Sequence, residues 1–169
     1  MKIFHGTRAN FTNFSVNYPG TGEGGRIHAI WFTDNFKGAK NHALFHARQP
    51  GPGRVYECVL SADALILKAG IPLYEQSAVY KAISAHLPVS ISVQKDYDHL
   101  FSDYHRLSGK VNHHSDVENL HNNILMSAGI DAIYDYEGCW TDAYLHGCTT
   151  VVLSPDKIKI LEIHDLSQI

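Results

Sequence analysis

Two segments near the N-terminus constrain the fold of this chain more than any others. Residues 2–5 have the pattern of a short buried strand, which leads into His5-Gly6-Thr7. A second, aromatic-rich strand is expected at about 27–33, and Asp34 or Asn35 can then cap a helix over roughly 35–47. The sequence therefore predicts two strands joined by a polar, glycine-rich loop over 8–26, with a helix directly after the second strand.

The remainder of the chain alternates turn signals with strand and helix patterns. Pro50–Gly53 predicts a turn, and the strand expected after it covers 54–60. Helical patterns follow at 72–86, 95–107 and 117–129, the last ended by Gly129, and strand patterns at 131–136, 149–153 and 157–163. Because strands gather at both ends around a helical middle, we expect one α+β domain over residues 1–169 instead of alternating βαβ units.

Charge and cysteine content narrow the class of protein. The net charge is −3 with the lysines and arginines scattered, so a nucleic-acid partner is not expected. Three cysteines without a CxxC pattern favour a reducing compartment. No signal peptide and no membrane-spanning run are recognisable, so we expect a cytoplasmic protein, or one delivered into a host cell.

The patterns at both ends of the chain resemble the ADP-ribosyltransferase superfamily, in the His-Tyr-Glu class of diphtheria toxin and the poly(ADP-ribose) polymerases. That class has a strand ending in His-Gly-Ser/Thr, then an aromatic strand and a helix with another ring. The C-terminal part is similar to the ADP-ribosyltransferase domains of phage polyvalent proteins, through Gly129–Ile133 and Thr149–Lys159. The resemblance implies split antiparallel β-sheets with flanking helices.

The resemblance also implies an activity. It predicts a mono-ADP-ribosyltransferase that cleaves NAD at the nicotinamide–ribose bond and transfers ADP-ribose to a protein acceptor. NAD is then a co-substrate and no metal is required. The likeness to phage proteins suggests a setting in phage–host or toxin–effector conflict. Two alternatives use the same residues: an NAD glycohydrolase, with water as acceptor, or an inactive binding module.

Roles in binding NAD follow from the resemblance residue by residue. His5 would bind the adenosine ribose and Gly6 the nicotinamide carboxamide through its backbone. Trp31 and His42, eleven residues apart, would stack the nicotinamide, with Phe36 or Phe45 as alternatives to His42. The remaining residues expected to bind NAD are Thr7, Phe32, Thr33 and Arg26, where Arg26 would meet the pyrophosphate or simply be solvated.

The catalytic carboxylate is the point at which this chain departs from the family. Thr149 stands where the family has its glutamate, and threonine cannot stabilise a cation electrostatically. Glu137 is the first substitute expected, followed by Asp135 and Asp142. Strand alternation predicts that Asp135 shares a face with Ile133, while Tyr134 and Tyr136 share the other.

Metal binding is the competing chemistry for the histidines. His114, Glu118 and His121 are spaced four and three residues apart, which would align them on one helical face. No HExxH or paired-cysteine zinc spacing accompanies them. Solvated side chains explain the spacing more simply, and we expect no metal.

Overall fold

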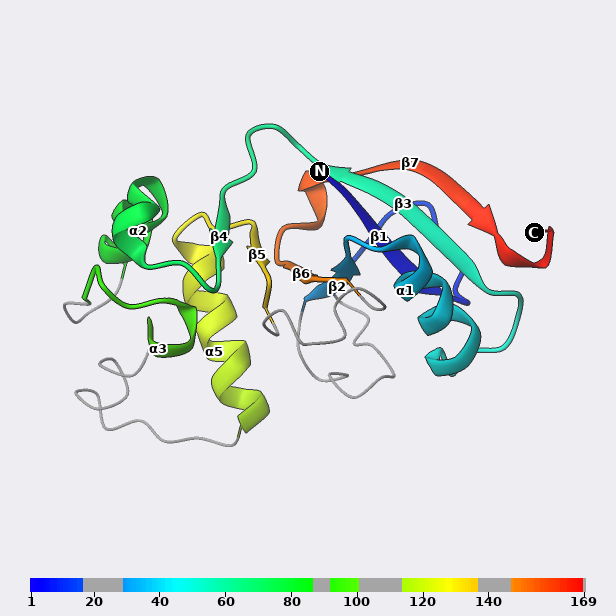
Figure 1. The fold of residues 1–169 in the computed structure, drawn as a ribbon. Coiled ribbons are helices and arrows are strands. Elements are labelled where there is room, and N and C mark those ends of the chain that lie inside the picture. The colour runs from blue at the N-terminus through cyan, green and yellow to red at the C-terminus, as the bar shows by residue number, and fades with distance from the viewer. Residues whose placement is uncertain (17–28, 87–91, 101–113, 137–146, 169) are drawn as a thin grey trace.

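The computed structural model describes residues 1–16, 29–86, 92–100, 114–136 and 147–168, without the side chains of Asp98 and residues 114–119. Its described strands form one seven-stranded mixed sheet in the order β4-β5-β6-β2-β1-β3-β7 (Figure 1). The strands are β1 Lys2–Thr7, β2 Ile30–Thr33, β3 Arg54–Leu60, β4 Ile66–Lys68, β5 Ala132–Tyr134, β6 Thr149–Val152 and β7 Ile158–Asp165. All neighbours are antiparallel except β4 and β5, which are parallel. The α+β class expected from the sequence is confirmed.

The helices lie at two separate places along the sheet. Helix α1 (Phe36–Asn41) continues as a π-helix over His42–His46 and lies over β1, whereas α2 (Ser77–Ser84), α3 (Tyr97–Leu100) and α5 (His114–Ser127) gather beside β4 and β5 (Figure 1). Among the described residues, short 3₁₀ helices span Leu73–Glu75, Pro155–Lys157 and Leu166–Gln168. Within the described ranges, no helix is long and apolar enough to cross a membrane.

Local sequence signals explain where α1 begins and where α5 ends. Asn35 has extended backbone angles, and its side chain accepts hydrogen bonds from the backbone N–H groups of Lys37 (2.9 Å) and Gly38 (3.3 Å). At the end of α5, Gly129 adopts a φ of +89° and the N–H of Ile130 donates to the Leu125 carbonyl at 2.9 Å. Both the capping residue and the terminating glycine were expected from the sequence.

Two hydrophobic clusters cover opposite faces of the sheet. One packs α2, α3 and α5 against one face and includes Ile133 and Val151. The other lies on the opposite face, includes Ala132 and Val152, and is covered in part by the 11–16 segment. Since neighbouring strand residues alternate between these clusters, the sheet itself separates them.

Three features differ from the sequence expectations. Strand β4, with only three residues, was not expected, and its parallel pairing with β5 comes from the crossover through α2, α3 and α5. The predicted helix at 72–86 is a 3₁₀ turn followed by α2. The expectation that Tyr136 lies on the face opposite Ile133 is wrong, because Asp135 has a φ of +60° and the alternation ends there; Tyr136 packs against the cluster that contains Ile133.

Candidate functional site

His5 lies at the junction between β1 and β2. Its Nδ1 atom is 2.7 Å from the carbonyl oxygen of Trp31, and its ring is 5.3 Å from the ring of Phe14 and 5.5 Å from that of Phe32. Burial among these rings lowers the pKa of His5 to about 4, against the raising effect of the Trp31 carbonyl. The ring is therefore neutral near pH 7 with its proton on Nδ1, which leaves Nε2 as a hydrogen-bond acceptor.

Gly6 and Thr7 follow on the same strand and are both buried. A Cβ atom at Gly6 would lie 1.9 Å from the carbonyl oxygen of Ala39, so glycine is required for α1 to pack against β1. The Thr7 hydroxyl accepts a hydrogen bond from the backbone N–H of Ala9 at 3.1 Å. Packing against α1 is thus a reason for glycine here that the sequence reading did not include.

The three predicted residues of β2 point to alternate faces. Phe32 is buried on the side of His5, and Trp31 lies on the other face, where its ring meets that of Tyr136 edge-on at 5.2 Å. The Tyr136 ring in turn lies 5.5 Å from the ring of Tyr97. Thr33 accepts a hydrogen bond from the backbone N–H of Asn35 at 3.2 Å. Trp31 therefore belongs to an aromatic group, Trp31–Tyr136–Tyr97, of which the sequence identified only the first member.

His42 lies at the start of the π-helical turn after α1. It is exposed, and its ring lies 5.9 Å from that of His46 in a stacked arrangement. Partial desolvation and the charge of His46 lower the pKa of His42. A charge on His42 also lowers the pKa of His5, so the two histidines are electrostatically coupled. The described ring contacts thus place His42 with His46, and Trp31 with Tyr136.

Asp135 follows β5 and has two unusual properties. Its φ of +60° is the only positive value among the described non-glycine residues, and its Oδ1 atom is buried with no hydrogen-bond partner. A Cβ atom at Gly70 would lie 4.0 Å from its other oxygen, so the carboxylate lies beside the turn that follows β4. The next residue, Tyr136, donates its backbone N–H to the Thr149 carbonyl at 3.1 Å. Asp135 is thus followed by a residue that pairs with Thr149, the position at which the resemblance predicted a glutamate.

Several expected residues lie outside the described part of the chain. These are Glu137, Asp142 and Arg26, together with the side chains of His114 and Glu118.

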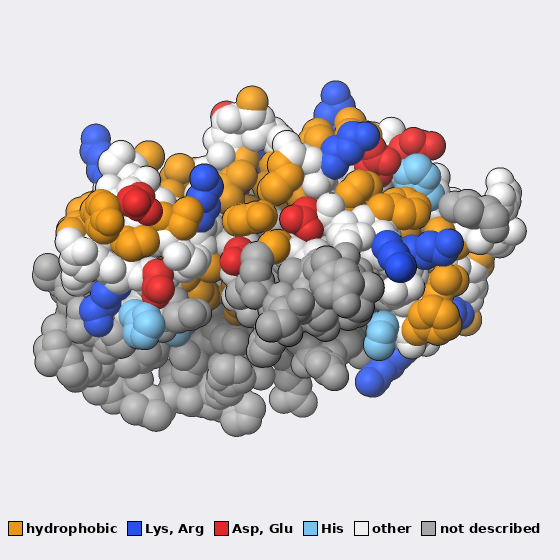
Figure 2. Space-filling model, viewed as in Figure 1, with side chains coloured by type: hydrophobic (Ala, Val, Ile, Leu, Met, Phe, Trp, Pro, Cys, Tyr) orange, Lys and Arg blue, Asp and Glu red, His pale blue; other side chains and the backbone are white. Residues whose placement is uncertain are grey.

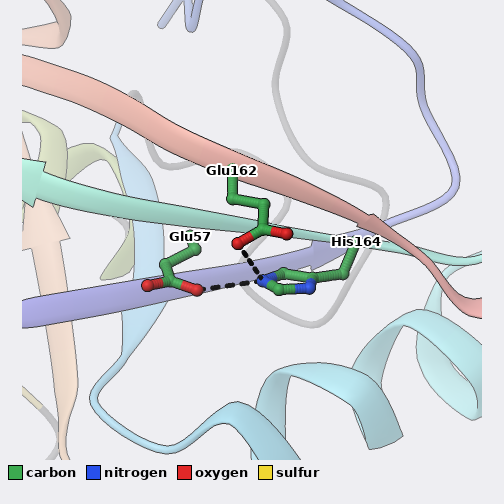
Figure 3. A group of neighbouring side chains, drawn as sticks. All are labelled: Glu57, Glu162 and His164. Atoms are coloured by element: carbon green, nitrogen blue, oxygen red, sulfur yellow. Dashed lines mark hydrogen bonds and ion pairs between the residues drawn. The ribbon is translucent and has the colours of Figure 1, made fainter.

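A second polar cluster, which the sequence reading missed, lies on β3 and β7. Glu57, Glu162 and His164 bring their side chains to one point on the sheet (Figure 3). Glu57 and Glu162 are opposite each other in the strand register, 105 residues apart in the chain (162 minus 57). Only the pairing of the strands reveals this group, since no local spacing connects β3 with β7.

Comparisons with known proteins give no family. No family model, no curated protein and no solved structure matches this chain.

Proposed function

We propose that this protein cleaves NAD at the nicotinamide–ribose bond and transfers ADP-ribose to an acceptor, with Asp135 as the catalytic carboxylate. The observation that carries the proposal is the buried, unpartnered oxygen of Asp135 on a residue with left-handed backbone, next to Thr149. Strained backbone and unsatisfied buried polar groups cluster at functional sites, because a folded chain retains their cost only where they serve a purpose. The carboxylate has, on this proposal, moved from β6 to the end of the neighbouring strand.

A free carboxylate oxygen suits the chemistry. Cleavage of the glycosidic bond builds positive charge on the ribose, as in glycoside hydrolysis generally. A carboxylate oxygen that accepts no hydrogen bond from the protein can stabilise that charge without first losing a hydrogen bond. Electrostatic stabilisation by one preorganised group is worth roughly 10²–10³ in rate.

The described strands form one continuous mixed sheet and not the split antiparallel sheets that the resemblance implies, but β1 and β2 are joined by a short pairing. These strands share a single register pair, Phe4 with Thr33, whereas β1 and β3 share six, from Lys2–Val59 to Thr7–Arg54. Beyond Phe4, Nδ1 of the His5 side chain lies 2.7 Å from the Trp31 carbonyl oxygen. We propose that NAD binds on the face of the sheet that carries Trp31 and Tyr136, with Trp31 stacking on the nicotinamide. The ring of His5 lies on the opposite face and is assigned no contact with NAD.

The test is nicotinamide release from NAD, measured for the wild type and three variants with their folding checked by circular dichroism. Asp135→Asn is expected to lower the rate about 10²–10³-fold. Asp63→Asn is the control, because Asp63 is an exposed partner of Lys157 before the start of β4, whereas Asp135 lies beside Gly70 after the end of that strand. Glu137→Gln tests the carboxylate favoured by the sequence reading.

Which variants lose nicotinamide release distinguishes the alternative functions and the alternative catalytic carboxylates. A loss only in Asp135→Asn supports the proposal, whereas a loss only in Glu137→Gln moves the carboxylate to Glu137. Free ADP-ribose as the sole product would make the protein an NAD glycohydrolase, and labelled acceptor protein would make it a transferase. NAD binding without any nicotinamide release would refute catalysis and favour a binding module, as Thr149 in place of glutamate would suggest.

A further inference from the structure

The cluster on β3 and β7 has the donor set and the spacing of a transition-metal site. The Nε2 atom of His164 lies 2.9 Å from Oε2 of Glu57 and 3.8 Å from Oε2 of Glu162 (Figure 3). One ligand atom from each residue lies within 4.8 Å of the other two. Four ligands at about 2.0–2.1 Å around a tetrahedral zinc ion are roughly 3.3–3.4 Å apart. The two separations from Nε2 of His164 lie on either side of that value, and the two carboxylate oxygens lie within 4.8 Å of each other.

A shift in strand register creates this grouping. Cys58 is opposite Ile160, but Glu57 is opposite Glu162, so Leu161 is an extra residue in β7. Without it, Leu161 and Ile163 would stand on the face of Glu57, and Glu162 and His164 would point away. With the extra residue, Leu161 is 45% exposed and Ile163 is 44% exposed. The register shift therefore exposes two apolar side chains and brings a carboxylate and an imidazole to Glu57. Bulges that redirect side chains in this way are frequent beside functional sites.

We propose that Glu57, Glu162 and His164 bind a divalent transition-metal ion, with Zn²⁺ as the ion of choice. Imidazole with carboxylates suits zinc, and three protein ligands leave a fourth position for water. Acidic, basic and histidine side chains gather over this end of the sheet (Figure 2). The Glu162 side chain is 64% exposed and that of Glu57 is 12% exposed, so the site opens to solvent on the Glu162 side.

The surroundings of the three ligands orient them for this role. Oε1 of Glu57 forms an ion pair with the ammonium group of Lys2, and Oε2 of Glu57 faces Nε2 of His164. Oε2 is therefore the oxygen that would bind the ion. The His164 ring lies edge-on to that of Phe36 at 5.1 Å, which fixes its plane. When zinc binds, Nε2 of His164 releases any proton that it carries and donates its lone pair to the ion. Zinc would then join β7, the last strand of the sheet, to β3.

The experiment is zinc titration of the full chain by calorimetry after treatment with a chelator. The wild type is expected to bind one Zn²⁺ at the site, and Glu162→Gln and His164→Asn should each weaken that binding at least about tenfold. Glu162→Gln is the decisive variant, because its exposed side chain can be changed without unfolding the protein. His86→Asn, which changes an exposed histidine after α2, is the matched control and should bind zinc as the wild type does.

A second readout separates this site from the other histidines of the chain. Zinc should raise the melting temperature of the wild type and of His86→Asn but not that of Glu162→Gln, because an ion that binds only the folded state stabilises it. Mg²⁺ at the same concentration should not, since it prefers oxygen ligands alone. Equal zinc affinity in the wild type and Glu162→Gln, or no binding by the wild type, would overturn the proposal and leave Lys2, Glu57 and His164 as an ion-pair network.

Discussion

The two ends of the sheet differ in whether their buried polar groups have hydrogen-bond partners. At the β1–β3–β7 end these groups have partners: Glu57 binds Lys2 and His164, and the Tyr56 hydroxyl binds both the N–H and the carbonyl of Phe11 at 3.0 Å. At the β4–β5–β6 end, four buried side-chain atoms lack a partner in the described structure: Asn122 Nδ2 and Oδ1, Asp135 Oδ1 and Thr150 Oγ1. Leaving such an atom unsatisfied costs about 1–3 kcal/mol.

On the proposed function, this difference separates an end of the sheet that stabilises the fold from an end that holds the catalytic carboxylate. Long strands with six and seven register pairs build the first end, and its polar groups close on one another. Strands of three and four residues, covered by helices, build the second, and four buried polar atoms there have no described partner. We therefore expect substitutions at the first end to change stability, and substitutions around Asp135 to change activity.

The largest effect on stability is expected from Gly6→Ala. The added Cβ atom would lie 1.9 Å from a backbone oxygen of α1, which cannot move without displacing the helix, so we expect a loss of about 3 kcal/mol or more. Gly70→Ala is the matched change at the other end, where the nearest atom is 4.0 Å away, and should alter stability by less than about 0.5 kcal/mol. Urea denaturation measures both, and a similar loss in the two variants would contradict the assignment of rigidity to the β1 end.

His5 should make stability depend on pH. Its folded pKa of about 4 lies below the ordinary 6.5, so the unfolded chain binds the proton more tightly and stability falls as pH decreases from 6.5 towards 4. Between pH 7.5 and 5 the wild type should lose about 2 kcal/mol that His5→Gln does not lose. The lowered pKa of Glu57, due first to Lys2, acts in the same direction but only as pH falls below the ordinary carboxylate value of 4.5. Equal pH dependence in both proteins above pH 5 would mean that His5 is solvated.

Asp135→Gly should separate stability from activity at the second end. Glycine accepts a φ of +60° without strain and removes the unpartnered oxygen, so the variant should gain about 1 kcal/mol of stability while nicotinamide release is lost. Asp131→Gly, directly before β5, is the control, because Oδ2 of Asp131 accepts the N–H of Leu65 at 2.8 Å and its loss should destabilise. Thermal unfolding of both variants measures the sign, and destabilisation by Asp135→Gly would make Asp135 a structural residue.

Local signals in the sequence predicted one part of the molecule well. Strand β3 covers the predicted 54–60, α1 begins after Asn35, and α5 is terminated at Gly129, since turn residues and caps act within a few positions. The parallel β4, the extra residue Leu161 and the left-handed Asp135 depend on pairing with distant strands, and no nearby residue indicates them. For the same reason the sequence identified His5 and Trp31 but not that their rings lie on opposite faces, nor that Tyr136 meets Trp31.

The most local effect is expected at Asn35, where the two ends of the sheet meet. The backbone N–H of Asp34 donates to the Cys148 carbonyl at 3.2 Å, and the N–H of Cys148 donates to Oδ1 of Asp34 at 2.8 Å. These two bonds join the start of α1 to the segment before β6. Asn35→Ala removes the cap of α1 and should cost about 1 kcal/mol. Because the Asp34–Cys148 bonds remain, the loss should stay within α1, and hydrogen exchange should rise at Lys37 and Gly38 but not in β5 or β6. Faster hydrogen exchange in β6 as well would show that the two ends of the sheet unfold as one unit. The division between a stable end and an end with unpartnered polar atoms would then fail.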